Sequence, residues 1–187
     1  QALDAAFERD FADIPIRLAR HRPTLTIWGV DGSQPMLTLG QEAIEQAHLT
    51  DNIKLFHGFL PGVCDVLPSD RGLSAVISNS LLHHLHDPGV LWREVLALRE
   101  RAGKSLAVWV VDLVRPATAE AAQALVAQYA DGEPEVLRTD FLNSLHAAFT
   151  ADEVRAQLLE GGPKLSGLEV EVISDRHLSI GGVVLTY

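Results

Sequence analysis

Hydrophobic and polar positions divide this chain into short apolar runs and longer segments with helical spacing. The apolar runs at residues 25–30, 53–56, 73–78 and 105–111 have the length and composition of strands, and the last of them (SLAVWVV) is apolar throughout. A strand of that kind is expected to be buried on both faces, as in the centre of a parallel sheet. The alternation predicts an α/β fold in which helices cover a mostly parallel sheet.

Capping residues predict where several helices begin. Ser33 is a good N-cap for a helix over residues 35–47. Thr150 and Glu153 have the spacing of a capping box, in which each residue satisfies a backbone N–H near the helix start. The last two apolar segments, residues 168–172 and 181–187, are joined by a short connection, so we expect an antiparallel hairpin at the end of the sheet.

Composition and charge narrow the classes of function. The 187 residues are 47% hydrophobic and 21% charged, which predicts one globular domain over residues 1–187. Fifteen basic and 25 acidic residues give a net charge of −10 without a basic stripe, so we expect no nucleic-acid partner. No apolar run reaches the roughly 18 residues that span a bilayer, and no signal peptide is visible. We therefore expect a cytoplasmic monomer or homodimer with no membrane partner.

Polar residues follow two of the predicted strands, at the sheet edge where ligands bind in open α/β sheets. Asp31 comes directly after the strand at residues 25–30, and its carboxylate can either accept hydrogen bonds from a ribose diol or cap the following turn. His83 and His84 follow the strand at residues 73–78. We predict no metal site here, because adjacent side chains diverge and further ligands of clear spacing are lacking. Core packing remains an alternative for this histidine pair.

The order and spacing of three segments resemble class I S-adenosylmethionine-dependent methyltransferases. Residues 26–33 (TIWGVDGS) resemble the second strand and turn of that family, residues 75–85 (AVISNSLLHHL) its fourth strand, and residues 103–116 its fifth. The resemblance implies a Rossmann-like three-layer sandwich whose seven-stranded sheet is mostly parallel with an antiparallel C-terminal hairpin strand. The family's first strand and Gly-rich turn have no counterpart, and we expect them to be missing near Phe11 and Ala12.

The resemblance also implies a cofactor, S-adenosylmethionine, with S-adenosylhomocysteine as product. Asp31 would bind the ribose hydroxyls of this cofactor. Other residues would line its adenosine side (Gly32, Ser33, Met36), its adenine (Gly58, Phe59, Leu60) and its methionine part (Asn79, Ser80). The family often has an Asp where this chain has Phe59, so a carboxylate contact to the adenine amino group is not implied.

The resemblance places His84 or His83 near the methyl-transfer site, where either could act as a general base. The acceptor is expected to be a small molecule, bound by a lid over residues 117–149 and by the final hairpin. The candidate acceptor-binding residues are Tyr129, Arg138, Asp140, Asn143, Arg176 and His177. The alternative for these residues is structural, with Asp140 and Asn143 capping a helix and Arg176 in a surface ion pair.

Two other functions remain open at this stage. One is a non-catalytic, methyltransferase-like binding or scaffold protein, which the absent Gly-rich turn favours. The other is an NAD-binding dehydrogenase that uses Asp31 on the ribose. The predicted antiparallel hairpin argues against the dehydrogenase, because the usual dinucleotide-binding sheet is parallel.

Overall fold

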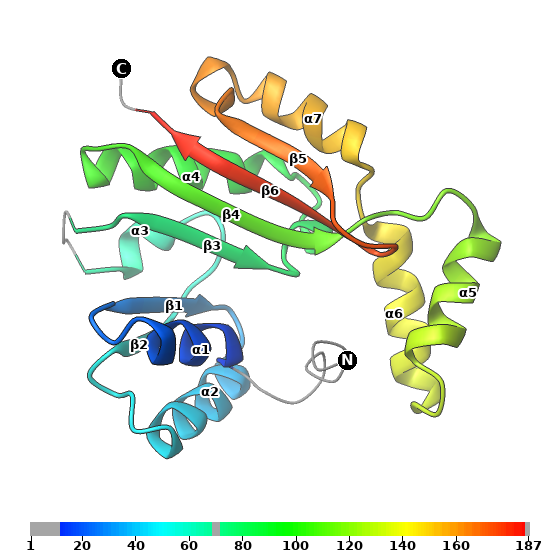
Figure 1. Ribbon diagram of the computed structural model, residues 1–187, viewed down its shortest axis with the longest axis horizontal. Helices are drawn as coiled ribbons and strands as arrows, with labels where there is room; N and C mark the ends of the chain where they lie inside the picture. The colour runs from blue at the N-terminus through cyan, green and yellow to red at the C-terminus, as the bar shows by residue number, and fades with distance from the viewer. Residues whose placement is uncertain (1–11, 69–71, 186–187) are drawn as a thin grey trace. The chain divides into compact units, whose positions relative to one another are not determined.

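The computed structural model describes residues 12–68 and 72–185 and divides the chain into two compact units, Gln1–Ser69 and Asp70–Tyr187 (Figure 1). We describe each unit by itself. The predicted junction near Phe11 lies at the edge of the described residues, since Phe11 itself is outside them. That all 187 residues form one domain stays a prediction.

The N-terminal unit is a two-stranded parallel sheet with flanking helices. Its elements are α1 (Asp13–His21), β1 (Ile27–Asp31), α2 (Gln34–Gln46), β2 (Ile53–His57) and the short α3 (Val63–Val66). Strand β1 pairs with β2 from Ile27 opposite Ile53 to Asp31 opposite His57. Ile16 and Ala19 of α1 pack with Ile44 and Ile53 in the core of this unit. The buried side chains of α1 and α2 therefore fix the direction of β1 and the turn that follows it.

The C-terminal unit contains a four-stranded mixed sheet. Its elements are β3 (Ala75–Asn79), η1 (Leu82–His84), α4 (Gly89–Ala102), β4 (Leu106–Leu113), α5 (Ala119–Tyr129), α6 (Glu135–Ala147), α7 (Ala151–Glu160), η2 (Pro163–Leu165), β5 (Leu168–Val172) and β6 (His177–Val184). The strand order is β3-β4-β6-β5. Strand β3 is parallel to β4, whereas β6 is antiparallel to both β4 and β5. The predicted C-terminal hairpin is confirmed.

Within the C-terminal unit, α4 and α7 lie against the same face of the sheet (Figure 1). Trp92 of α4 donates a hydrogen bond from Nε1 to Oε1 of Gln157 on α7 at 3.2 Å. Val108 and Val110 of β4 point to this face and are buried, whereas Trp109 between them is 51% exposed. The expectation that this apolar strand is buried on both faces is therefore wrong, because the described helices of this unit cover one face and leave Ala107 and Trp109 exposed on the other.

The described residues form six strands in two sheets and not the seven-stranded sheet that the resemblance implies. Two of the strand pairs are parallel and two are antiparallel, so the sheet is also less parallel than expected. The physical reason is that the described residues before β1 form helix α1, which begins at Asp13. No strand precedes this helix in the described part of the chain.

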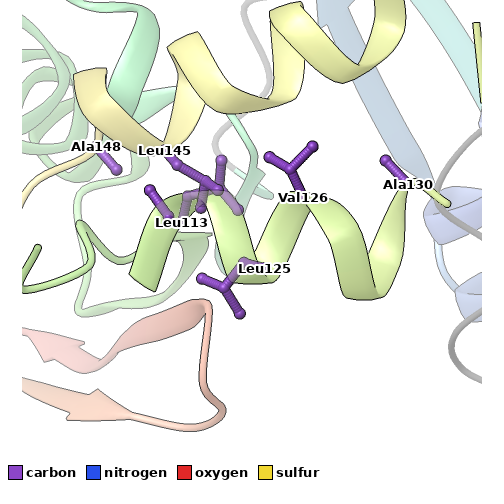
Figure 2. Close-up of a cluster of buried hydrophobic side chains, with 7 residues drawn as sticks. Leu113, Leu125, Val126, Ala130, Leu145 and Ala148 are labelled. Atoms are coloured by element: carbon purple, nitrogen blue, oxygen red, sulfur yellow. The ribbon is translucent and has the colours of Figure 1, made fainter. Parts of the chain in front are cut away.

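Helices α5 and α6 form an antiparallel hairpin after the carboxyl end of β4. Its core joins both helices and the end of β4 through small and aliphatic side chains (Figure 2). These are Leu113, Ala122, Leu125, Val126, Ala130, Leu145 and Ala148. Thr118 caps α5 by accepting a hydrogen bond from the backbone N–H of Ala121 at 3.2 Å. The predicted lid segment thus has a hydrophobic core of its own.

Candidate functional site

The turn after β1 carries the first group of predicted site residues. Asp31 accepts a hydrogen bond at Oδ1 from the backbone N–H of Ser33 at 2.7 Å, which closes the turn. Ser33 in turn caps α2, since its Oγ accepts from the N–H of Met36 at 3.4 Å. The cap of α2 is therefore Ser33, as predicted, and Asp31 holds the turn before it. Its second oxygen, Oδ2, has no hydrogen-bond partner among the described residues.

Gly32 and Phe59 are brought together at this turn. A Cβ atom on Gly32 would lie 2.4 Å from Cε1 of Phe59, so only glycine leaves room for the ring in its present position. The ring of His57 meets Phe59 edge-on at 5.2 Å, and its Nε2 lies 3.1 Å from the carbonyl oxygen of Gly32. Phe59 is nevertheless 64% exposed. The turn therefore presents an apolar ring beside a carboxylate oxygen.

The remaining predicted residues of this unit lie near the same turn. The backbone N–H of Gly58 donates to the carbonyl of Asp31 at 3.1 Å, which joins the ends of β1 and β2. A Cβ on Gly58 would lie 3.0 Å from Val30 and Val66, so this position is also tightly packed. Leu60 is half-buried, and Met36, in the first turn of α2, is 38% exposed.

Asp112, near the carboxyl end of β4, organises a second group of side chains in the C-terminal unit. It is 1% exposed and accepts three hydrogen bonds. Its Oδ2 accepts from the backbone N–H of Leu82 at 2.7 Å. Its Oδ1 accepts from the N–H of Leu113 at 2.7 Å and lies 2.6 Å from Nδ1 of His83. One buried carboxylate thus fixes the short helix η1 and one imidazole to the end of the central strand.

The two predicted catalytic histidines have different surroundings. His83 is 9% exposed, whereas His84 is exposed on the surface of η1. Their rings lie 4.0 Å apart between centroids, tilted by 39°. Partial burial is the main cause that lowers the pKa of His84, and His83 lowers it further, while Asp112 and Asp140 raise it. Helix α6, which carries Asp140, packs against η1. A lowered pKa keeps His84 neutral and able to accept a proton near neutral pH.

The tip of the β5–β6 hairpin is held to α5 by contacts with Tyr129. Tyr129 donates a hydrogen bond from its hydroxyl to Oδ2 of Asp175 at 2.7 Å, and the guanidinium of Arg176 lies 3.4 Å from the centroid of the Tyr129 ring. Arg176 also lies 3.7 Å from Asp175, but its side chain is only 11% exposed. The ion pair considered for Arg176 therefore exists, but its arginine is mostly buried while Asp175 is 44% exposed, and the arginine also makes a cation–π contact.

His177 follows Arg176 along the chain, at the start of β6 and opposite Leu113 of β4. Its Nδ1 is 3.2 Å from Oγ of Ser174. Burial is the main cause that lowers the pKa of His177, and Arg176 adds to the effect, whereas Asp112 and Asp175 oppose it. Asp112 therefore acts electrostatically on both His84 and His177, which places all three near the carboxyl end of β4.

Other predicted residues of this unit do not join the Asp112 cluster directly. Arg138 and Asn143 are exposed on α6 and line shallow hollows of about 490 and 560 Å³ on that helix. Asn143 and Asp140 lie inside α6 and so do not cap it, which makes that alternative wrong. At the end of β3, Nδ2 of Asn79 donates to Oγ of Ser80 at 3.2 Å, and the N–H of Ser80 donates to the carbonyl of Val111.

Asp112 is the residue that sequence reasoning missed. The sequence does contain a signal for this residue, because Asp112 is the one acidic side chain in the apolar strand LAVWVVDL. A carboxylate in such a strand needs a partner, since burying an unpaired charge is costly. The partner, His83, lies 29 positions earlier, so the pairing could not be read from local spacing.

The described residues show neither a metal-binding group nor a membrane-spanning helix. No group of three or more His, Cys, Asp or Glu side chains in residues 12–68 and 72–185 is arranged to hold a metal ion. Over the same ranges, every helix is too short or too polar to cross a lipid bilayer.

Comparison with known proteins gives structural matches only. No protein-family model matches the chain, and no curated protein matches it significantly. A methyltransferase structure from Aquifex aeolicus, described as dependent on SAM, shares 13% identity, covering 86% of this chain and 69% of its own, with a TM-score of 0.57. The plantazolicin methyltransferase BamL, solved with a triazolic desmethylPZN analog and SAH, shares 10% identity over 95% of this chain and 74% of its own, with a TM-score of 0.67.

A third solved structure, also of a methyltransferase, matches the chain. The methyltransferase domain of bacterial CtHen1-C shares 18% identity, covering 95% of this chain and 86% of its own, with a TM-score of 0.58. Three differently described methyltransferases therefore align with nearly the whole chain. The chain has the fold of class I S-adenosylmethionine-dependent methyltransferases, which confirms the resemblance at the level of fold.

Proposed function

We propose that this protein is an S-adenosylmethionine-dependent methyltransferase that acts on a small-molecule acceptor. The observation that carries the proposal is the methyltransferase fold, which matches 86–95% of the chain in the three structures compared. Fold alone does not define function, so the argument also needs side chains suited to the chemistry. These are found at the carboxyl ends of β1 and of β3–β4, where open α/β sheets bind their ligands.

The turn after β1 fits the nucleoside part of the cofactor. Asp31 uses one carboxylate oxygen to close its turn and keeps the other available for a ribose hydroxyl. The exposed ring of Phe59 supplies a flat apolar surface of the kind on which a purine base stacks. Gly32, Ser33, Met36, Gly58 and Leu60 complete the proposed adenosine-binding turn. SAH in the matched BamL structure supports the same cofactor for this chain.

The residues in the C-terminal unit suit the part of the cofactor that donates the methyl group. Asn79 and Ser80 would lie along the methionine part of the cofactor, which supplies an electrophilic methyl group when bound. The protein's own task is to hold the acceptor in line, exclude water and accept a proton where the acceptor carries one. His84 or His83 would accept that proton, and Tyr129, Arg138, Asp140, Asn143, Arg176 and His177 would line the acceptor site under α5 and α6.

The net charge and one matched protein support the proposed class of acceptor. BamL was solved with a triazolic desmethylPZN analog, and we take a compound of that kind as support for a small acceptor here. The net charge of −10 favours neutral or cationic molecules over nucleic acids. We also propose a cytoplasmic location and a monomeric or homodimeric state, as expected from the sequence.

A second candidate function is a methyltransferase-like binding protein without catalysis. The observation that favours it is the absence, in the described residues and in the sequence, of the family's first strand and Gly-rich turn. That turn normally approaches the carboxypropyl end of the cofactor. The NAD-binding dehydrogenase is disfavoured, because the terminal strands form the antiparallel hairpin that a parallel dinucleotide-binding sheet lacks.

Calorimetric titration with S-adenosylhomocysteine tests the proposal. We expect micromolar binding that weakens at least tenfold in Asp31→Ala and is unchanged in Asp51→Ala, an exposed aspartate two residues before β2. NAD serves as the competing ligand. Absence of S-adenosylhomocysteine binding by the folded protein would favour the binding-protein alternative, and tight binding of NAD would favour the dehydrogenase.

A further inference from the structure

Asp112 defines how the ring of His83 is held. Both carboxylate oxygens accept backbone N–H groups, from Leu82 and Leu113, so the carboxylate acts as an acceptor throughout. His83 must then be the donor in the 2.6 Å contact, with its proton on Nδ1. A histidine that donates from Nδ1 to a buried carboxylate is fixed in one orientation. His83 is 9% exposed, so an acceptor molecule has little access to it.

His84 differs from His83 in its exposure, which a general base needs in order to reach the acceptor molecule. It lies on the exposed side of η1, with its ring 4.0 Å from that of His83. The charged and titratable groups that act on it come from three elements, namely His83 of η1, Asp112 of β4 and Asp140 of α6. Because Asp112 fixes both the backbone of η1 and the ring of His83, it also determines where the ring of His84 can lie.

We infer that His84 alone is the proton acceptor, that Asp112 and His83 are its positioning residues, and that the acceptor molecule carries a proton on its attacking oxygen or nitrogen. This inference rests on the proposed function and deepens it. In the proposed step the acceptor's O–H or N–H proton moves to Nε2 or Nδ1 of His84. The freed electron pair of that oxygen or nitrogen forms the new bond to the methyl carbon. The carbon–sulfur bond of the sulfonium donor breaks, and its electron pair stays on sulfur.

The charges around His84 argue against a carboxylate acceptor. A carboxylate needs no base and is best held by a bidentate arginine. Of the two arginines proposed for the acceptor site, Arg176 is stacked on Tyr129 and lies next to Asp175. The other, Arg138, is exposed on α6 outside the Asp112 cluster. The groups that act on His84 include two carboxylates, Asp112 and Asp140, which would repel an anion. A neutral acceptor with a dissociable proton suits this environment.

Histidine ring NMR tests the positioning roles without an acceptor or a cofactor. Long-range ¹H–¹⁵N correlation is expected to show the proton of His83 on Nδ1 at neutral pH. In His83→Gln the pKa of His84 should rise, because a neighbour that lowers it is removed. In Asp112→Asn it should fall, because a carboxylate that raises it is removed. His86→Gln, an exposed histidine in the next turn of chain, is the control and should leave the pKa of His84 unchanged.

The decisive result is that the pKa of His84 shifts in opposite directions in the two variants. A general loosening of the structure would shift this pKa in the same direction in both. Should Asp112→Asn fail to fold, His83→Gln and the tautomer of His83 still decide the positioning roles. An unchanged pKa of His84 in His83→Gln, or a His83 that carries no proton on Nδ1, would overturn them. Titration with S-adenosylhomocysteine gives an independent readout, so its failure would contradict the proposed function while leaving the NMR result interpretable.

The acceptor class is tested in the S-adenosylhomocysteine-loaded protein with phenol, aniline and benzoate as probes. Phenol or aniline is expected to shift the ring resonances of His84 but not those of His86, and benzoate is expected to shift neither. The phenol and aniline arms distinguish an oxygen acceptor from a nitrogen acceptor. A response of His84 to benzoate alone, or to none of the three, would overturn the inferred class.

Discussion

The turn after β1 and the cluster around Asp112 are built by opposite means. In the turn, the contacts join residues two or three positions apart, such as Asp31 with Ser33 and Ser33 with Met36, and the key side chain, Phe59, is exposed. In the cluster, Asp112 is buried and its partners His83 and Leu82 lie 29 and 30 positions away. The first site is a local backbone shape, whereas the second exists only when strands and helices have assembled.

This difference predicts how each site responds to substitution. Changes in the turn should alter local shape and ligand affinity with little effect on the rest of the unit. Changes in the cluster should reduce global stability, because buried polar groups lose their partners when one member is removed.

The largest expected effect is that of Asp112→Ala. The substitution leaves the N–H groups of Leu82 and Leu113 and the ring of His83 without their acceptor. Breaking such a buried pair costs about 3–5 kcal/mol of unfolding free energy. Urea unfolding measures the loss, and Asp131→Ala, at an exposed aspartate after α5, should remain within about 0.5 kcal/mol of the parent. Equal stability of the two variants would contradict the central role of Asp112.

A smaller effect is expected in the core of the α5–α6 hairpin. Leu145→Ala removes a side chain that is fully buried in that core and should cost about 2–5 kcal/mol. Hydrogen exchange should accelerate in Leu145→Ala relative to the parent, and more for the amides of α5 and α6 than for those of β4. Val136→Ala, at a 72% exposed position of the same helix, is the control. Uniform acceleration over the whole C-terminal unit would mean that this hairpin does not open separately.

At the turn after β1, Gly32→Ala should cost about 1 kcal/mol, because the new Cβ displaces an exposed ring that can move. The displaced ring is that of Phe59. In a Phe59→Ala background the same substitution should cost much less, because the ring that it meets is gone. Thermal unfolding of the four proteins in this cycle measures the coupling. Additive effects of the two substitutions would show that Gly32 and Phe59 do not interact.

The smallest effect concerns the capping box of α7, which is partly exposed to solvent. The hydrogen bond from the backbone N–H of Thr150, followed by the Arg115 side chain, lowers the pKa of Glu153. A lowered folded-state pKa gives stability that is present above the unfolded value of 4.5 and is lost as the pH falls through the folded value. Glu153→Gln should therefore cost less than about 1 kcal/mol at pH 7, and less still at pH 3.

Thermal unfolding at the two pH values measures this change. Glu160→Gln, at the exposed last position of the same helix, serves as the control and should show no such pH dependence. A difference between Glu153→Gln and the parent that grew toward pH 3 would contradict the predicted sign.

The same contrast explains what the sequence could predict. Ser33 as the cap of α2 and the box of Thr150 with Glu153 are confirmed, because caps depend on residues a few positions apart. The terminal hairpin is confirmed for a similar reason, since its two strands are joined by a short connection. Local chemistry of this kind carries its own signal in the sequence.

Features that depend on assembly were harder to predict. The exposure of Trp109 depends on which face of the sheet α4 and α7 cover, and the burial of Arg176 depends on Tyr129, 47 residues earlier. The pairing of Asp112 with His83 likewise required the β3–β4 register. The roles of the predicted site residues in binding and catalysis stay predictions, which the experiments above address.

The position of β6 has a consequence for the order in which the protein can assemble during synthesis. This strand follows β3, β4 and β5 along the chain, yet it lies between β4 and β5 in the sheet. Ribosomes release a chain from its N-terminus, so the inner edge of β4 stays open until β6 has emerged. Because Arg176 and His177 arrive with that same strand, the acceptor site that we propose is completed only after β6 has joined β4.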